Sequence, residues 1–203
     1  MKIVYQGIPG SYSEACAQKN YPGVETIACK TFDECFEKAS KDNNVRALIP
    51  ESNKTTGNIG VEYLIFRYKL NIYAEHFFPI NHHLMAIKNA TINDIKDVYS
   101  HAQALSQSSS FIKKYNLIEN VRADTAGSAK FVSESKSKSN AAIASELSSK
   151  IYDLNILKRN IQDDKDNTTR FILFGKEIFE PEIEDKKYIT SLLFKLKSKP
   201  AAL

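Results

Sequence analysis

A regular alternation between short apolar runs and segments of helical character limits the fold of this chain most strongly. The apolar runs read as strands at residues 3–6, 47–50, 72–78, 84–87, 97–99, 121–123, 141–144 and 171–174. Ser or Thr stands where a strand gives way to a helix, as at Ser11, which with Glu14 marks a helix that begins at Tyr12. Thr31 and Glu34 repeat this pattern, and amphipathic character over about 103–115 predicts a longer helix. This order predicts an α/β fold with mostly parallel sheets and helices on both faces.

The composition suits one large domain or two small lobes. Of the 203 residues, 42% are hydrophobic and 26% are charged, which is enough for a substantial core. No run of 18 or more apolar residues occurs, so we expect no membrane span. The first residues, M-K-I-V-Y-Q-G, lack the apolar region of a secretory signal, and we therefore expect a cytoplasmic protein.

The charges and cysteines exclude several classes of site. The net charge is +4, and the lysines are scattered among acids, which is not the clustered pattern of a nucleic-acid-binding surface. The one dense patch, at residues 130–138, is broken by serines. A mildly basic background favours small anionic ligands. Cys16, Cys29 and Cys35 have no metal-ligand spacing, so we expect free thiols in a reducing compartment and no metal site.

Hydroxyl side chains follow several of the predicted strands. In a parallel sheet, ligands bind at the carboxyl ends of strands, where helix N-termini present unpaired N–H groups. The junctions at residues 10–13, 100–103, 125–128 and 145–146 are candidates for such a place. If they converge on one cleft, they predict a site for an anion with several oxygens, although each hydroxyl alone also suits simple helix capping.

The segment N-T-T-R-F-I-L-F-G, at residues 167–175, places several polar side chains directly before an apolar run. Its apolar half reads as a buried strand, and Asn167, Thr168, Thr169 and Arg170 stand directly before it. These side chains make a poor general base but a good receptor for carboxylates. Arg170 has the planar fork that suits a carboxylate, and an ion pair that fixes the cleft is its alternative role.

Six segments together resemble the motifs of prephenate dehydratase catalytic domains. They are G-I-P-G-S-Y-S-E, I-P-E-S-N-K-T-T-G-N-I, S-H-A-Q-A-L-S-Q, D-T-A-G-S-A, A-A-I-A-S-E-L-S-S-K-I-Y-D-L and I-Q-D-D-K-D-N-T-T-R-F. The resemblance implies a two-lobed fold like the type II periplasmic binding proteins, with the active site in the cleft between lobes. It implies a catalytic domain over 1–178, with lobe 1 at about 1–77 and 164–178 and lobe 2 at about 78–163. Residues 179–203 resemble a linker and the first strand of a truncated ACT regulatory domain.

The activity implied by the resemblance is the conversion of prephenate, a dianion, to phenylpyruvate, carbon dioxide and water. Aromatisation drives this reaction, so it needs no metal, no cofactor and no covalent nucleophile. The resemblance implies Thr169 and Asn53 as catalytic residues, with Thr169 assisting departure of the ring hydroxyl. The expected substrate-binding residues are Arg170, Asn167, Thr168, Ser11, Tyr12, Ser13, Lys54, Ser100, His101, Gln103, Thr125, Ala126, Ser128 and Phe171.

Several of these residues have a structural alternative. The serines and threonines at helix starts also suit capping alone. His101 is a candidate acid, but a histidine at a helix start more often packs or caps. Tyr12, Phe171 and Phe174 suit the core as well as a platform for the substrate ring.

The loop at residues 50–57 departs from the family pattern. The family carries P-I-E-N-S, whereas this chain reads P-E-S-N-K, with Ser52 at the usual glutamate and Lys54 at the usual serine. This difference leaves open arogenate dehydratase activity, in which the substrate has an amine in place of the keto group. A non-catalytic small-anion-binding protein of the same fold is the alternative from another class. A homo-oligomer, dimer or tetramer, is also compatible with the sequence.

Overall fold

The computed structural model describes residues 1–178, which form two α/β lobes. The first lobe is built on a sheet with the strand order β2 (Glu25–Cys29), β1 (Lys2–Gln6), β3 (Val45–Asn53), β11 (Thr168–Gly175) and β5 (Asn71–Pro79). The short β4 (Gly57–Asn58) pairs with β3. Three helices belong to this lobe, namely α1 (Tyr12–Asn20), α2 (Phe32–Lys41) and α3 (Glu62–Tyr68).

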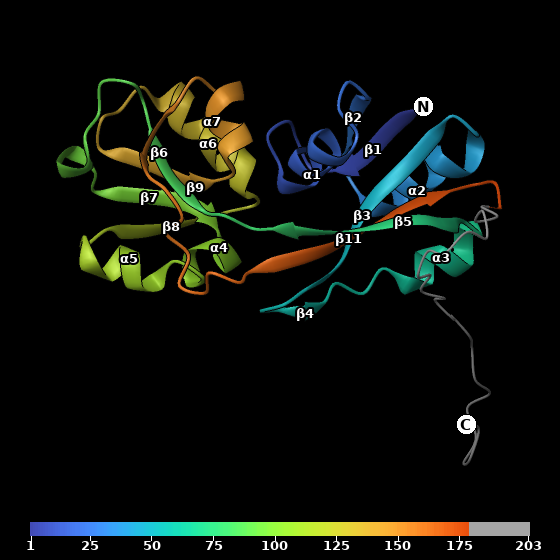
Figure 1. Cartoon of the computed structure of the whole chain (residues 1–203). Helices are drawn as coiled ribbons and strands as arrows, with labels where there is room; N and C mark the ends of the chain where they lie inside the picture. The colour runs from blue at the N-terminus through green and yellow to red at the C-terminus, as the bar shows by residue number, and fades with distance from the viewer. Residues whose placement is uncertain (179–203) are drawn as a thin grey trace, which may run out of the picture.

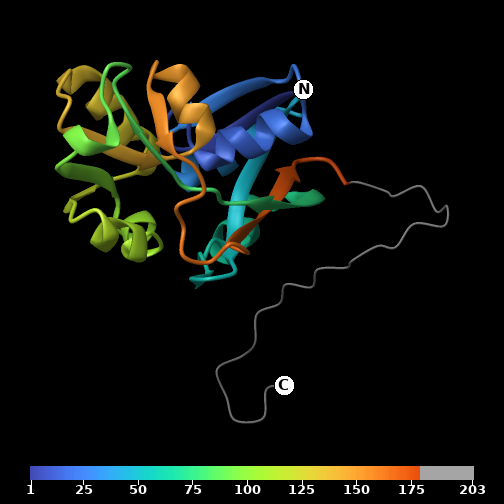
Figure 2. The same ribbon diagram turned by 60° about the vertical axis from the view of Figure 1, so that its left-hand side comes forward.

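The second lobe is built on a sheet with the order β10 (Asn155–Lys158), β6 (His83–Ala86), β9 (Asn140–Ala144), β7 (Asp97–His101) and β8 (Ile118–Arg122). Its helices are η1 (Ile92–Asp94), α4 (Ala102–Ser106), α5 (Ser109–Lys114), α6 (Thr125–Ser135) and α7 (Glu146–Ile151). Figures 1 and 2 show the lobes side by side, with β5 and β11 lying together where the chain passes between them. The predicted two-lobed α/β fold is confirmed.

The sheets are mixed, so the expectation of mostly parallel sheets was wrong in this detail. Strand β1 is parallel to β2 and β3, and β7 is parallel to β8 and β9. The other five pairings are antiparallel. The physical reason in the first lobe is the return of the chain from the second lobe: β11 enters between β3 and β5 and runs antiparallel to both.

Helix starts follow the predicted caps. Ser11 caps α1 by accepting from the backbone N–H of Glu14, and Thr31 caps α2 in the same way through Glu34. The predicted helix over 103–115 is instead two short helices that break at Gln107 and Ser108. The break lets the returning segment dock, since Asp163 donates its N–H to the Gln107 carbonyl and its carboxylate accepts from the N–H of Ser110 in α5.

Helices pack on both faces of each sheet, as predicted. In the first lobe, Phe36 of α2 and Leu64 of α3 pack on one face, and Cys16 and Ala17 of α1 pack on the other. In the second lobe, one core includes α4 and α5 side chains, and the other includes α6 side chains. The three cysteines are free and buried, as expected.

Among residues 1–178, no helix combines the length and apolar character needed to cross a membrane. The expected linker and ACT-like strand at 179–203 lie outside the described residues.

Candidate active site

A cavity of about 700 Å³ lies where the two lobes meet. Its walls come from the carboxyl ends of strands and the helix starts that follow them, which is where an α/β sheet binds ligands. Nine of the residues predicted for the site line it. They are Ser11, Tyr12, Ser13, Asn53, His101, Gln103, Thr125, Thr169 and Phe171.

Thr169 and Asn53 meet at the floor of this cavity. Strands β11 and β3 are antiparallel, and their register sets Thr169 opposite Asn53. The Asn53 Nδ2 donates to the Thr169 Oγ1 over 2.8 Å. Both residues are 7% exposed. Because the Thr169 oxygen accepts this bond, its own proton is available to donate to a molecule in the cavity.

A chain of polar side chains extends from Asn53 across both lobes. Asn53 Nδ2 also donates to Asn167 Oδ1 over 2.9 Å, and Asn167 Nδ2 donates to Gln107 Oε1 over 3.1 Å. The same Gln107 oxygen lies 2.9 Å from His82 Nε2. His82 Nδ1 in turn lies 2.7 Å from the Tyr12 hydroxyl. Burial lowers the pKa of His82, so the imidazole is neutral near pH 7.

Side-chain hydrogen bonds at two places hold the lobes together. Gln103 and Gln107 of the second lobe donate to the hydroxyls of Thr56 and Thr55 in the first lobe. At the other place, the hydroxyls of Ser145 and Ser148 at the start of α7 both donate to the Gly10 carbonyl, over 2.6 and 2.8 Å. The junction at residues 145–146, a predicted anion site, therefore binds the opposite lobe's backbone.

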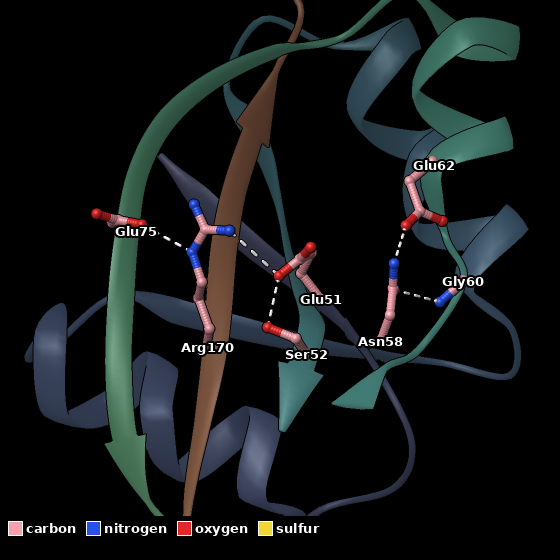
Figure 3. Close-up of polar contacts among 7 residues, drawn as sticks. All are labelled: Glu51, Ser52, Asn58, Gly60, Glu62, Glu75 and Arg170. Atoms are coloured by element: carbon pink, nitrogen blue, oxygen red, sulfur yellow. Dashed lines mark hydrogen bonds and ion pairs between the residues drawn. The ribbon is translucent and has the colours of Figure 1, made fainter. Parts of the chain in front are cut away.

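Arg170 lies outside the cavity wall, on the other face of β11 from Thr169. Its Nε donates to Glu75 of β5 over 2.8 Å, and its Nη1 donates to Glu51 of β3 over 3.2 Å (Figure 3). Ser52 donates to the same Glu51 oxygen. The three charged side chains are each between 20% and 27% exposed. Arg170 therefore has the alternative role of a structural ion pair, in which its guanidinium joins β11 to the neighbouring strands β3 and β5.

Six other predicted binding residues do not line the cavity. Asn167 is 2% exposed and acts within the polar chain described above. Three of the remaining five donate to backbone carbonyls: Ser100 to Ile143, Ser128 to Asp124 and Thr168 to Asp166. Ala126 is fully buried. Lys54 is exposed beside Asp166.

The cavity also contains residues that the sequence reasoning missed. Lys30, Asp124, His82 and Gln107 all line it. Gln107 had a usable signal, because it stands four residues after Gln103 and one helical turn brings such side chains to the same side. Asp124 precedes a predicted helix start and caps α6 by accepting from the N–H of Gly127 over 2.6 Å. For Lys30 and His82, no sequence pattern pointed to the cleft.

The cavity wall offers mainly hydrogen-bond donors, together with the cation of Lys30 and the carboxylate of Asp124. Hydroxyls of Ser11, Ser13 and Thr125 and the amide of Gln103 face the same space as Lys30. Such a wall suits a small, oxygen-rich anion. Within residues 1–178, no group of three or more His, Cys, Asp or Glu side chains is arranged to hold a metal ion.

Comparisons with known proteins show to which family this chain is similar. The family model for prephenate dehydratase matches residues 3–178. The chain is 39% identical to arogenate dehydratase 2 of Petunia hybrida, over 100% of this chain and 52% of that protein. It is 38% identical to the chloroplastic arogenate dehydratase/prephenate dehydratase 2 of Arabidopsis thaliana, over 100% of this chain and 53% of that protein.

A solved structure is similar as well. The prephenate dehydratase of Arthrobacter aurescens, in complex with L-Phe, superposes with a TM-score of 0.81 at 26% identity, over 91% of this chain and 63% of that chain. The chain spans about half the length of the curated relatives it matches. On the family match and these relatives together, the chain belongs to the prephenate dehydratase family.

Proposed function

We propose that the chain catalyses the decarboxylating dehydration of prephenate to phenylpyruvate, a step toward L-phenylalanine. One observation carries the proposal: the Thr169 hydroxyl accepts from Asn53, which leaves its own proton available to a molecule in a cavity rich in anion-binding groups. The family match over residues 3–178 supports the same reaction.

In the proposed reaction, the bond from the ring to one carboxylate breaks and its electron pair enters the ring. The ring carbon–oxygen bond breaks at the opposite end, so the products are phenylpyruvate, carbon dioxide and hydroxide, which becomes water with one proton. Aromatisation supplies the driving force. The chain must therefore hold the dianion in one pose and stabilise negative charge on the departing oxygen.

We assign that stabilisation to Thr169. A threonine hydroxyl is a weak acid, so its role is a hydrogen bond to the leaving oxygen. One preorganised donor of this kind contributes about 3 kcal/mol to the transition state. We assign the carboxylates of the substrate to the donors on the opposite walls, namely Ser11, Ser13, Gln103, Thr125 and Lys30.

Arogenate is the second candidate substrate, and a specific observation favours it. Arogenate carries an ammonium group where prephenate carries a keto oxygen, so it needs an acceptor. Asp124 supplies a carboxylate in the same cavity, and its Oδ1 is occupied by the Gly127 N–H. Two of the relatives are also named for arogenate.

The first experiment mixes the purified chain with prephenate and follows phenylpyruvate by its absorbance in alkali, with arogenate assayed in parallel by formation of phenylalanine. Folded protein that accelerates neither reaction would contradict the proposed function and favour the non-catalytic anion-binding protein. The variant Asp124→Asn keeps an oxygen for the cap and removes the charge. It should lower kcat/KM for arogenate by about tenfold or more, relative to prephenate. Asp94→Asn, at a capping acid outside the cavity, is the matched control.

The remaining expectations belong to the same proposal. The division of the catalytic domain at about residues 77/78 and 163/164, and the ACT-like identity of residues 179–203, rest on the family resemblance. A cytoplasmic location is also a proposal, since the Arabidopsis relative is named as chloroplastic. A homo-oligomer, dimer or tetramer, can be measured by light scattering of the purified chain.

A further inference from the structure

We propose that His82 is a positioning residue that holds the Thr169 hydroxyl as a donor through a chain of side-chain amides. The proposal rests on the dehydratase function proposed above. It follows from the direction of each hydrogen bond in this series of amides, and the backbone N–H of Thr55 sets that direction at one end of the series.

The direction begins at Asn53. The backbone N–H of Thr55 lies 2.9 Å from one end of the Asn53 side-chain amide. A backbone N–H can only donate, so that end is the carbonyl oxygen Oδ1. The other end is therefore Nδ2, and its two protons go to Asn167 Oδ1 and Thr169 Oγ1. Thr169 is left as an acceptor toward Asn53 and a donor toward the cavity.

The same logic orients the next two amides. Asn167 accepts with Oδ1, so its Nδ2 faces Gln107 and requires an oxygen there. Gln107 therefore presents Oε1 to Asn167, and its Nε2 donates to the Thr55 hydroxyl. That hydroxyl donates to Asn53 Oδ1 over 2.6 Å, so the ring of bonds closes without a mismatched pair.

The tautomer of His82 follows from Gln107. The oxygen Oε1 has no proton, so the His82 nitrogen that lies 2.9 Å away must carry one, and Nε2 is the donor. Burial favours the neutral imidazole, which leaves Nδ1 as an acceptor for the Tyr12 hydroxyl at 2.7 Å. The Gln107 oxygen of the second lobe therefore selects the tautomer, and the Tyr12 hydroxyl of the first lobe is compatible with it as a donor to Nδ1.

The opposite tautomer of His82 would place N–H groups against one another along the series of amides. With Nε2 unprotonated, Gln107 would turn its Nε2 toward His82 and set an N–H group against Asn167 Nδ2. Asn167 would then turn and set its own N–H against Asn53 Nδ2, which competes with the bond that Asn53 makes to Thr169. The Thr55 N–H fixes Asn53, and a donor at His82 Nε2 keeps Gln107 and Asn167 in the orientations that leave the Asn53 bond to Thr169 without a competitor.

Two substitutions of His82 separate this role from ordinary packing. The Gln side chain places an N–H near the position of Nε2, so His82→Gln should keep the bond to Gln107. The shorter Asn side chain can only replace the Nδ1 position, so His82→Asn should keep the Tyr12 contact and lose Gln107. Tyr12 has a second acceptor in the Asn81 carbonyl at 3.0 Å, which lets it tolerate His82→Gln.

The expected result is a separation in kcat. His82→Asn should lower kcat by on the order of 10²-fold, the cost of a small misplacement of a catalytic group, with little change in KM. His82→Gln should keep kcat close to that of the unsubstituted chain. His83→Asn is the matched control, because it is the same change at the adjacent buried histidine, whose Nδ1 accepts only from the Asn160 N–H in the described residues. Equal kcat values for His82→Asn and His82→Gln would overturn the proposal.

A second measurement tests the bond direction without catalysis. Nitrogen chemical shifts of the His82 ring report which nitrogen carries the proton, and the proposal requires protonated Nε2 with unprotonated Nδ1. A protonated Nδ1 with unprotonated Nε2 would overturn the positioning role, whether or not the chain is active. If the chain turns over neither prephenate nor arogenate, the proposed function fails, while the ring shifts still report on the tautomer.

Discussion

The Asn53 amide on β3 donates to the Thr169 hydroxyl on β11 over 2.8 Å, so Asn53 orients the hydroxyl of Thr169. Asn53→Asp should therefore be severe, because a carboxylate would accept the Thr169 proton and remove it from the cavity. We expect kcat on prephenate to fall by about 10²- to 10³-fold, with a smaller change in KM. Asn20→Asp, at the end of α1 away from the cavity, is the control. An unchanged kcat in Asn53→Asp would contradict the assignment.

Arg170 should contribute to stability and not to substrate affinity. Its guanidinium joins Glu51 and Glu75, and these side chains are about three-quarters buried. Arg170→Met leaves both carboxylates without their partner and should lower the free energy of unfolding by about 1–3 kcal/mol, less than for a fully buried pair. Chemical denaturation measures this loss, and KM for prephenate should stay unchanged. A large rise in KM without loss of stability would mean that Arg170 binds the substrate.

Gly10 allows the first lobe to approach α7. Its φ of 92° favours glycine, and a Cβ there would lie 2.7 Å from the Ser148 hydroxyl that donates to the Gly10 carbonyl. Gly10→Ala should disturb the contact between lobes and raise KM, with a loss of about 1–3 kcal/mol in the free energy of unfolding. Gly23→Ala is the control, since its φ of 79° imposes comparable strain but its Cβ would meet nothing within 4 Å. Equal KM values for the two variants would contradict this role.

Stability should fall in mild acid. Burial lowers the pKa of His76, His82 and His83 below the ordinary histidine value of about 6.5. Nearby Glu75 opposes this effect at His76, whereas Arg159 adds to it at His83. The unfolded chain then binds more protons than the folded chain, so stability is present above about pH 6.5 and is lost as pH falls through the folded pKa values.

Each such histidine contributes at most about 1.4 kcal/mol per pH unit within its titration range. Urea unfolding at several pH values between about 7.5 and 5.5 measures the slope. In His82→Asn the slope should be shallower, because one of the three histidines is gone. A free energy of unfolding that stays constant or rises over this range would contradict the expected burial of these rings.

The parts of the fold set by local sequence were predictable. The caps at Ser11 and Thr31 begin helices where expected, because a hydroxyl and a following N–H are neighbours in the chain. The antiparallel placement of β11 was not predictable, since it depends on which way the chain returns from the second lobe. The break at Gln107 and Ser108 likewise depends on Asp163, which lies more than fifty residues further along.

The candidate site divides in the same way. Residue types at strand ends pointed to Ser11, Thr125 and Thr169, which line the cavity. Ser100 and Ser145 also stand at strand ends, but their hydroxyls donate to backbone carbonyls. These carbonyls belong to residues that are distant in the sequence, so the sequence alone does not reveal the bonds. His82 was missed because its role is defined by partners from both lobes, and no spacing in the sequence brings those partners together.

The most direct test of the central proposal is kcat on prephenate for a matched pair of substitutions at Thr169. Thr169→Val keeps the shape and removes the hydroxyl, whereas Thr169→Ser keeps the hydroxyl. We expect kcat to fall by about 10²- to 10³-fold in Thr169→Val, with KM little changed, and to be largely retained in Thr169→Ser. A Thr169→Val chain that is folded and turns over prephenate at the unsubstituted rate would contradict the proposal.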